Sequence, residues 1–413
     1  MRIVSGRAAA VLVERLAARG VEFRGLEPRV RRIVNDVRRG GDRSLRRYAE
    51  RWDGLAPKQS LRVPQVEMSE AWKSLAPELR KSLRLAARRI RQFCRWQKPR
   101  NWMRSRRGIS LGQLVVPLES VGCYVPGGRY PLISTLLMTV IPAQVAGVKN
   151  IRVVSPKPSP EVLAAGAMLG VDEFYRVGGA QAVAALAYGT ESIPRVDKIV
   201  GPGNSYVTVA KKLVSFDCAI DFLAGPTEAV VLSDSGVPDF IAADLVAQAE
   251  HDAEALSVFL TTSRRLAQSV FASVTRLSKG NSTACESLRN RGAILIAESR
   301  EQALEWANRL APEHLTVPAK DLPFIENAGS VFVGNYSAQA AGDYASGPNH
   351  VLPTAGQARF RGGLSVADFV KVITVQELSA EGLRKIAPSL ECLASAEGLP
   401  AHAESVRLRC RHA

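Results

Sequence analysis

The stretch VGGAQAVAALAYGTESIPRVDKIVGPGN, residues 177–204, carries the local pattern from which the fold can be predicted. It opens with a glycine-rich turn and continues as an apolar, alanine-rich segment, Ala182–Ala187. It ends with a short β-branched run, Ile199–Val200, followed by the turn GPGN. The alanine-rich segment favours a buried helix, and the β-branched run favours a strand. The stretch is therefore part of a repeating strand–turn–helix pattern.

The same pattern recurs on both sides of this stretch, from about residue 115 to residue 214. Short apolar runs alternate with helical segments, and each run is followed by one of the turns VPGG, SPKP, VGGA and GPGN. The predicted strands are Val121–Val125, Ile151–Val154, Phe174–Val177 and Ile199–Val200, and the predicted helices are Leu132–Ile141, Val162–Leu169, Ala182–Ala187 and Tyr206–Leu213. This alternation predicts a parallel sheet that binds ligands at the carboxyl ends of its strands.

A second set of strand and helix patterns follows. Its predicted strands are Ala229–Leu232, Val258–Thr261, Ala293–Ile296 and Val331–Val333, with a helix from Pro238 to about Glu250. The first 110 residues and the chain after Arg361 are predicted to be helical. We therefore expect an α/β protein with two Rossmann-like parallel-sheet domains, one inserted in the other, and helical N- and C-terminal segments.

The expected first domain comprises residues 1–119 and 228–365, with a helical N-terminal region, and the inserted domain comprises residues 120–227. Residues 366–413 form a C-terminal arm in this prediction. The arm is too small to fold alone, so it must dock on its own chain or on a partner subunit.

Composition favours a soluble, cytoplasmic protein. The chain has 413 residues and six scattered cysteines without a CxxC pair, and its longest apolar stretches are interrupted well short of the roughly 18 residues of a membrane span. The net charge of +16 raises the question of nucleic acid. However, the twelve Lys and Arg residues in Arg80–Arg107 alternate with apolar residues at helical spacing, and no nucleic-acid-binding motif accompanies them. A solvated basic face is the preferred interpretation.

Four of the five histidines stand beside acids or amides, in QAEHD (248–252), PEHL (312–315), GPNH (347–350) and GLPAH (398–402). Gln248 and His251 are three positions apart near the end of a predicted helix, which puts them on one face. Imidazole, amide oxygen and carboxylate ligands suit zinc or a similar borderline ion. A surface polar patch is the alternative interpretation.

Glu313 and His314 follow Pro312, which predicts a loop rather than a helix. An imidazole can take a proton from an alcohol, and a carboxylate can activate water, although Glu–His pairs are also common by chance. The glycine-bracketed segment 342–350 would expose Asp343 and His350 together, or it is a turn with incidental polar residues. The turn GPGN at 201–204 could present N–H groups to an anion, but it is not a GxGxxG motif.

Taken together, these segments resemble the histidinol dehydrogenase family from about Val30 to Arg409. The motifs that carry the resemblance are DVRRGGD (36–42), GCYVPGG (122–128), the stretch 177–204, AGPTE (224–228), DLVAQAEHD, APEHL, GDYASGPNHVLPT (342–354) and the EGLPAH tail. The resemblance implies a zinc-dependent, NAD-linked enzyme that oxidises L-histidinol to L-histidine through L-histidinal, in the last steps of histidine biosynthesis.

The resemblance also implies the roles of individual residues. Glu313 and His314 would be the catalytic pair. The zinc ligands, one ion per subunit, would be Gln248, His251, Asp343 and His402. The substrate would contact these four ligands, His314, and also Thr227, His350 and Glu397, whereas NAD would contact Tyr124, Gln181 and Asn204. Enzymes of this family are homodimers, and His402 and Glu397 would serve the active site of the opposite subunit.

The chain departs from the family pattern at a few places. Thr227 stands where the family usually has Ser, the loop after Asp234 is one residue shorter than expected, and the first 25 residues match poorly. Thr227 and the short loop leave open a shifted substrate preference. The first alternative is therefore a related dehydrogenase for another polar alcohol. A metal beside a Glu–His pair would also suit a zinc hydrolase that needs no NAD, and the positive charge leaves a basic nucleic-acid-binding module as the third alternative.

Overall fold

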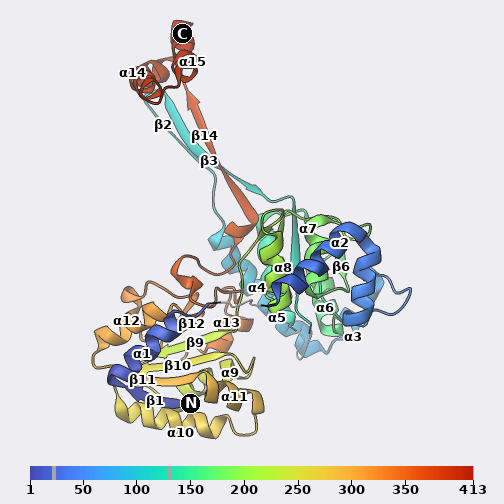
Figure 1. The fold of residues 1–413 in the computed structure, drawn as a ribbon, viewed down its shortest axis with the longest axis vertical. Helices are drawn as coiled ribbons and strands as arrows, with labels where there is room; N and C mark the ends of the chain where they lie inside the picture. Colours follow the sequence, from blue (N-terminus) through green and yellow to red (C-terminus); the bar gives the residue numbers. More distant parts are fainter. Residues whose placement is uncertain (21–24, 128–131, 413) are drawn as a thin grey trace.

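Two parallel sheets and a projecting antiparallel ribbon form the computed structural model, which describes residues 1–20, 25–127 and 132–412 (Figure 1). The predicted α/β class with two parallel sheets is confirmed. The last glycine of the VPGG turn, Gly128, lies outside the described residues. Within the described part of the chain, no helix is both long and apolar enough to cross a membrane.

The five-stranded sheet is formed by the repeating pattern around residues 177–204, and its strand order is β6-β5-β4-β7-β8. Its strands are β4 (Ser120–Tyr124), β5 (Asn150–Val154), β6 (Glu173–Tyr175), β7 (Lys198–Val200) and β8 (Ala219–Ile220). Its helices are α5 (Ile133–Ala146), α6 (Pro160–Leu169), α7 (Gly179–Tyr188) and α8 (Ser205–Val214). All its strand pairs are parallel, so the turns after β4, β5, β6 and β7 meet at one edge.

Helices from the N-terminal region cover both faces of this five-stranded sheet. They are α2 (Glu27–Tyr48), the π-helical turn η1 (Ala49–Asp53), α3 (Gln65–Ser74) and α4 (Pro77–Gln97). Helix α2 contacts α7 and α8, whereas α3 contacts α6 and α4 contacts α5. The expectation that this region belongs with the other sheet is therefore wrong, because its apolar stripe joins the core of the five-stranded sheet. A stripe predicts a buried face but not which surface buries it.

The six-stranded sheet has the order β1-β11-β10-β9-β12-β13, and all its pairs are parallel. Its strands are β1 (Arg2–Ser5), β9 (Glu228–Leu232), β10 (Leu256–Thr261), β11 (Gly292–Ile296), β12 (His314–Val317) and β13 (Ser330–Val333). Its helices are α1 (Gly6–Ala17), α9 (Pro238–Ala249), α10 (Arg264–Leu277), α11 (Ser282–Asn290), α12 (Arg300–Leu310) and α13 (Gln339–Tyr344), with the 3₁₀ turns η2 (Ala319–Phe324) after β12 and η3 (Gln357–Arg359) after α13. A third 3₁₀ turn, η4 (Val366–Phe369), packs on α4 and α5 in the core of the five-stranded sheet.

Alternating side chains of the central strands β9, β10 and β11 enter different cores. Val230 packs with α1 and α12, whereas its neighbour Val231 packs with α9, α10 and α11. Strands β1 and β12 were not among the predicted strands, because each has only four residues and lies beside helical or polar sequence.

The arm consists of β2 (Trp102–Arg106), β3 (Ile109–Pro117), β14 (Val370–Leu378), α14 (Ala380–Ala396) and α15 (Pro400–Arg411). Its three strands pair antiparallel, and the ribbon carries both C-terminal helices at its tip, away from the two parallel sheets (Figure 1). The prediction that both chain ends are helical throughout is therefore wrong for these strands. Strands β3 and β14 are more than 250 residues apart in the sequence, so no local pattern predicts that they pair.

Candidate active site

Most of the predicted catalytic and metal-binding side chains gather at the amino ends of β9 and β12. Thr227 directly precedes β9, and His314 is the first residue of β12. These two strands are neighbours, with His314 in register with Ala229. Gln248 lies near the end of α9, and Asp343 lies in α13. Two adjacent strands and two helices thus bring together residues that are up to 116 positions apart (227 to 343).

Glu313 is buried and has two hydrogen-bond donors on one oxygen. Its Oε2 accepts the Thr227 hydroxyl at 2.5 Å and the Glu228 N–H at 2.9 Å. Burial raises the pKa of Glu313 to about 7, against the opposing effects of the His314 charge and the two hydrogen bonds. A carboxyl group in this range can take up and release a proton near neutral pH.

His314 is also buried, and both ring nitrogens have a partner. Its Nδ1 lies 3.2 Å from the Glu228 carbonyl oxygen, and its Nε2 lies 3.5 Å from Oδ1 of Asp343. Burial opposes protonation, but the charges of Glu313 and Asp343 outweigh it and raise the pKa of His314. The ring stacks on Phe332, with centroids 5.8 Å apart. The carbonyl contact orients Nδ1–H inward and leaves Nε2 for proton transfer.

The backbone before this pair is irregular, which lets both side chains serve one site. Ala311 has a left-handed φ of 45°, and Pro312 follows it. His314 Nδ1 lies 3.7 Å from Oε2 of Glu313, although neighbours in a regular strand point apart. The predicted loop is correct for Glu313 but wrong for His314, because pairing with β9 begins at His314.

Three side chains at this site have the donor atoms that zinc prefers. The Nε2 group of Gln248 donates to the Thr227 hydroxyl, which leaves its Oε1 for a metal. His251 Nδ1 lies 3.0 Å from the Ala247 carbonyl, which orients Nε2 outward, as in metal-ligating histidines. Burial raises the pKa of Asp343, but the His314 hydrogen bond and the nearby histidine charges outweigh it and lower that pKa, which favours the ionised carboxylate.

His251 does not lie on a helical face with Gln248, as its spacing predicted. Helix α9 ends at Ala249, and His251 follows it with an N–H···O contact of 3.4 Å to the Gln248 carbonyl. Within the described residues, no three His, Cys, Asp or Glu side chains form a group that could hold a metal. The donors present fit a borderline ion, but one chain supplies an incomplete set.

The remaining predicted residues divide between the site and the arm. His350 is half-buried, and its Nδ1 lies 2.8 Å from the Asp343 carbonyl oxygen. Burial lowers the pKa of His350 despite the nearby Asp343 carboxylate. Glu397 and His402 lie at the end of α14 and in α15, at the tip of the arm, and the chain does not bring them to its own Glu313 and His314 (Figure 1).

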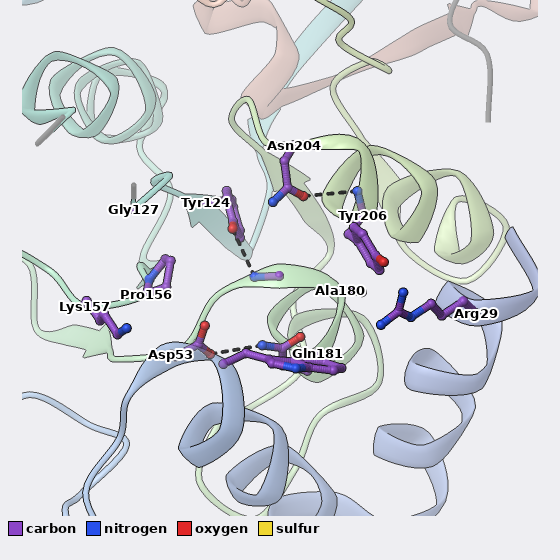
Figure 2. Close-up of a pocket in the computed structure, with 12 residues that line it drawn as sticks. Arg29, Asp53, Tyr124, Gly127, Pro156, Lys157, Ala180, Gln181, Asn204 and Tyr206 are labelled. Carbon is purple, nitrogen blue, oxygen red and sulfur yellow. Dashed lines mark hydrogen bonds between the residues drawn. The ribbon is translucent and has the colours of Figure 1, made fainter. Parts of the chain in front are cut away.

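A separate cavity of about 560 Å³ lies at the carboxyl edge of the five-stranded sheet, the edge that the sequence pattern predicts for a ligand. Figure 2 shows Tyr124, Gln181 and Asn204 around it. The Tyr124 hydroxyl accepts the Gly179 N–H at 3.0 Å. The Asn204 side chain accepts N–H groups at the start of α8, at 3.1 and 3.2 Å, and so fixes the GPGN turn.

Gln181 is the side chain in this cavity with an unmet hydrogen bond. Its Nε2 donates to Asp53 at 3.0 Å, but its buried Oε1 has no hydrogen-bond partner within residues 1–20, 25–127 and 132–412. Such an acceptor fits a ligand that brings an N–H group, as the amide and amine groups of a dinucleotide do. Other side chains that line the cavity were not among the predicted site residues; they include Arg29, Trp52, Asp53 and Lys157. Arg29, Trp52 and Asp53 lie in no motif and reach the cavity because α2 and η1 pack on this sheet, whereas Lys157 lies in the turn SPKP after β5.

The α/β fold thus has a cavity at one parallel sheet and a buried Glu–His pair at the other, and the comparisons that follow show that the protein is an oxidoreductase. The family model "Histidinol dehydrogenase" matches residues 17–410. The chain belongs to the histidinol dehydrogenase family.

Individual relatives agree with this assignment over nearly the full chain. The histidinol dehydrogenase of Methanothermobacter thermautotrophicus is 48% identical over 394 residues, which covers 92% of each chain. That of Aquifex aeolicus is 45% identical over 408 residues and covers 96% of each. The crystal structure of histidinol dehydrogenase from Elizabethkingia anophelis superposes with a TM-score of 0.95 at 35% identity, covering 100% of this chain and 98% of that one.

Proposed function

We propose that this protein is a cytoplasmic enzyme that oxidises L-histidinol to L-histidine through L-histidinal, using NAD and one zinc ion per subunit. The observation that carries the proposal is the buried Glu313–His314 pair, which Thr227 and Glu228 join by hydrogen bonds beside Gln248, His251 and Asp343. Acid, base and metal donors are arranged at one point, as a two-step oxidation requires.

The proposed chemistry uses His314 and Glu313 in turn. In the first step Nε2 of His314 takes the hydroxyl proton while the carbinol carbon loses a hydride, which gives the aldehyde. Glu313 then takes a proton from water as the water oxygen bonds to the aldehyde carbon, and protonated His314 gives its proton to the former carbonyl oxygen, which completes the hydrate. In the second step the hydrate carbon loses a hydride while His314 takes one hydroxyl proton, and release of the other hydroxyl proton to solvent leaves the carboxylate. Four electrons leave the substrate, so the balance requires two NAD for each histidinol.

Zinc and NAD each have a set of proposed binding residues. Gln248, His251 and Asp343, with His402 of the arm, would hold zinc, which when bound orients the imidazole and amine of the substrate. Thr227, His350 and Glu397 would contact the substrate. Tyr124, Gln181 and Asn204 would hold NAD, which when bound accepts the hydride. The cavity around Gln181 supports this assignment, because the Gln181 amide oxygen is buried there without a hydrogen-bond partner in the described part of the chain.

A homodimer with shared active sites would complete each metal site. Residues 120–227 form an inserted unit in this proposal, with α2–α4 packed on it. The arm (366–413 with β2 and β3) docks on a second copy of the chain. Large apolar side chains are exposed along the arm; they include Trp102, Met103, Leu114, Ile373 and Leu393. Such a surface calls for a covering partner, and His402 in this arm is the fourth proposed zinc ligand.

The His402→Ala variant should lose zinc and activity, since removal of one of four ligands weakens the site strongly. The matched control is His412→Ala, because His412 caps the same helix and is not a proposed ligand. Zinc per subunit, measured by atomic emission after gel filtration, should fall in the first variant and stay near one in the control. Full zinc occupancy in His402→Ala would remove His402 from the site.

Mixing two inactive variants tests whether the sites are shared. The His402→Ala chain keeps His314 but has a defective arm, whereas the His314→Asn chain keeps an intact arm but lacks the proposed base. In a mixed dimer, the intact arm of the second chain would complete the site of the first, which gives one intact site per dimer. After the two chains are unfolded and refolded together, about a quarter of the parental activity should return, as random pairing of subunits requires. If each chain uses its own arm, the mixture stays inactive.

Gln181→Met should weaken NAD binding roughly tenfold, because it removes the acceptor that the dinucleotide would satisfy. Tyr188→Phe is the control on the same helix, since its hydroxyl bonds Asp217 outside the cavity. Titration calorimetry with NAD measures both variants. Equal affinity in the two would place NAD elsewhere.

A further inference from the structure

The backbone of Glu228 contacts both members of the Glu313–His314 pair. Its N–H donates to Oε2 of Glu313 at 2.9 Å, and its carbonyl oxygen lies 3.2 Å from Nδ1 of His314. Glu228 is the first residue of β9, so the position at which this strand begins sets the orientation of both side chains. A small displacement here would move the carboxylate and the imidazole together.

The side chain of Glu228 is buried and is fixed by Arg19. Nε of Arg19 donates to Oε1 at 2.5 Å and Nη2 donates to Oε2 at 2.5 Å, a bidentate pair with side-chain exposures of 16% and 4%. The Ala355 N–H donates a third hydrogen bond to this carboxylate, to its Oε1, at 2.9 Å. Arg19 is itself held by the Leu16 carbonyl, which accepts from Nη1 at 2.8 Å. Through Arg19, the N-terminal segment thus fixes the position of the first residue of β9.

We propose that Arg19 is a positioning residue that acts on Glu313 and His314 through Glu228. The proposal rests on the catalytic roles proposed above for that pair. A bidentate guanidinium fixes a carboxylate in both position and plane, which an ammonium group does not. Without Arg19 the buried carboxylate of Glu228 loses the ion pair that fixes it, and although the charge of Arg359 still acts on it, the carboxylate must move or draw in water. Displacement of catalytic groups by about 1 Å costs on the order of 100-fold in rate.

A second ion pair offers a matched control. Glu14, in the helix α1 that precedes Arg19, pairs with Arg309 of α12. Both side chains are about half exposed, at 56% and 51%, and neither contacts Glu228, Glu313 or His314 through its side chain. Loss of this pair removes an anchor of the N-terminal helix without touching the site.

The test compares Arg19→Gln, Arg19→Lys and Arg309→Gln in the full, zinc-loaded protein. We expect kcat with L-histidinol to fall about 100-fold in Arg19→Gln and about tenfold in Arg19→Lys, with zinc content and the KM for NAD unchanged. Arg309→Gln should keep the parental kcat. Adding Glu228→Gln to Arg19→Gln should cost little more, since both changes break one interaction.

A spectroscopic measurement separates positioning from general stability. In ¹⁵N-histidine-labelled protein, the Nδ1–H signal of His314, assigned from its absence in His314→Asn, should shift or vanish in Arg19→Gln and stay unchanged in Arg309→Gln. Parental kcat and an unchanged His314 signal in folded Arg19→Gln would overturn the inference, as would equal losses in the Arg309→Gln control. If the parent does not oxidise histidinol, the proposed function fails, and the His314 signal still tests the positioning role.

Discussion

His314→Asn is expected to lower kcat for L-histidinol by roughly 1000-fold while zinc content stays near one per subunit. The asparagine amide can still donate a hydrogen bond towards the Glu228 carbonyl, which now lies 3.2 Å from Nδ1. It has no nitrogen that accepts a proton near neutral pH, so the hydroxyl proton has no base. His314 is not among the proposed zinc ligands, and metal binding should therefore survive.

Single-turnover formation of NADH, measured beside zinc content by atomic emission, checks this result. His412→Ala is the control for loss of a histidine outside the site. A rate within a few-fold of the parent would show that His314 is not the base. Loss of zinc in step with activity would instead make His314 a part of the metal site.

Glu313→Gln should act mainly on the second oxidation. We expect the oxidation of L-histidinal to slow by about 100-fold or more, whereas the oxidation of L-histidinol to the aldehyde should slow only a few-fold. The amide oxygen can still accept the hydrogen bonds of Thr227 and the Glu228 N–H, so the local structure is kept. It cannot take a proton from water, and hydration of the aldehyde depends on that step.

Separate assays started from each substrate distinguish the two oxidations. In the variant, the first NADH should form at a rate close to that of the parent, and the second should form slowly or not at all. Equal slowing of both steps would mean that Glu313 supports His314 rather than activating water. An unchanged rate in both steps would remove Glu313 from the chemistry.

The repeating βα units could be predicted from sequence because their signals are local. The strand at Ile151–Val154 was predicted within one residue of β5, and the helix at Val162–Leu169 within two residues of α6. Each combines β-branched or alanine-rich runs with a Gly- or Pro-rich turn, and these features act within a few residues.

The remaining structure depends on contacts between distant segments. Residues 370–378 were expected to be helical, but they form β14 against β3, where Ile373 faces Leu114. Helix α2 has a clear apolar stripe, yet the stripe does not show that its partner is α7. Long-range pairings of this kind are decided by packing, which a single sequence does not display.

The candidate site was predicted residue by residue through the family resemblance, whereas its geometry was not. The spacing of Gln248 and His251 predicted a shared helix face, but α9 ends before His251. The contacts that orient Glu313 and His314 come from the backbone of Glu228, and no motif identifies a backbone contact. Arg19, which holds Glu228, precedes the motifs that carried the resemblance, although the family model begins at residue 17.

The departure at Thr227 preserves the polar network of the site. Its hydroxyl donates to Glu313 and accepts from Gln248, which a serine hydroxyl would also do. The extra methyl group adds volume beside the catalytic pair without removing a hydrogen bond. A related dehydrogenase for another polar alcohol therefore stays the main competing interpretation. The two interpretations share the same site residues, so they are distinguished by which substrate the protein oxidises.

The most direct test is the yield of NADH per L-histidinol consumed, measured with and without a chelator. We predict two NADH per histidinol, loss of turnover after chelation, and recovery on addition of zinc. Turnover of another alcohol but not of histidinol would favour the related dehydrogenase, and hydrolysis without NAD would favour a zinc hydrolase. Salt-sensitive binding to DNA without NADH formation would favour the nucleic-acid module. A yield of one NADH, or turnover unaffected by the chelator, would contradict the proposed zinc-dependent four-electron oxidation.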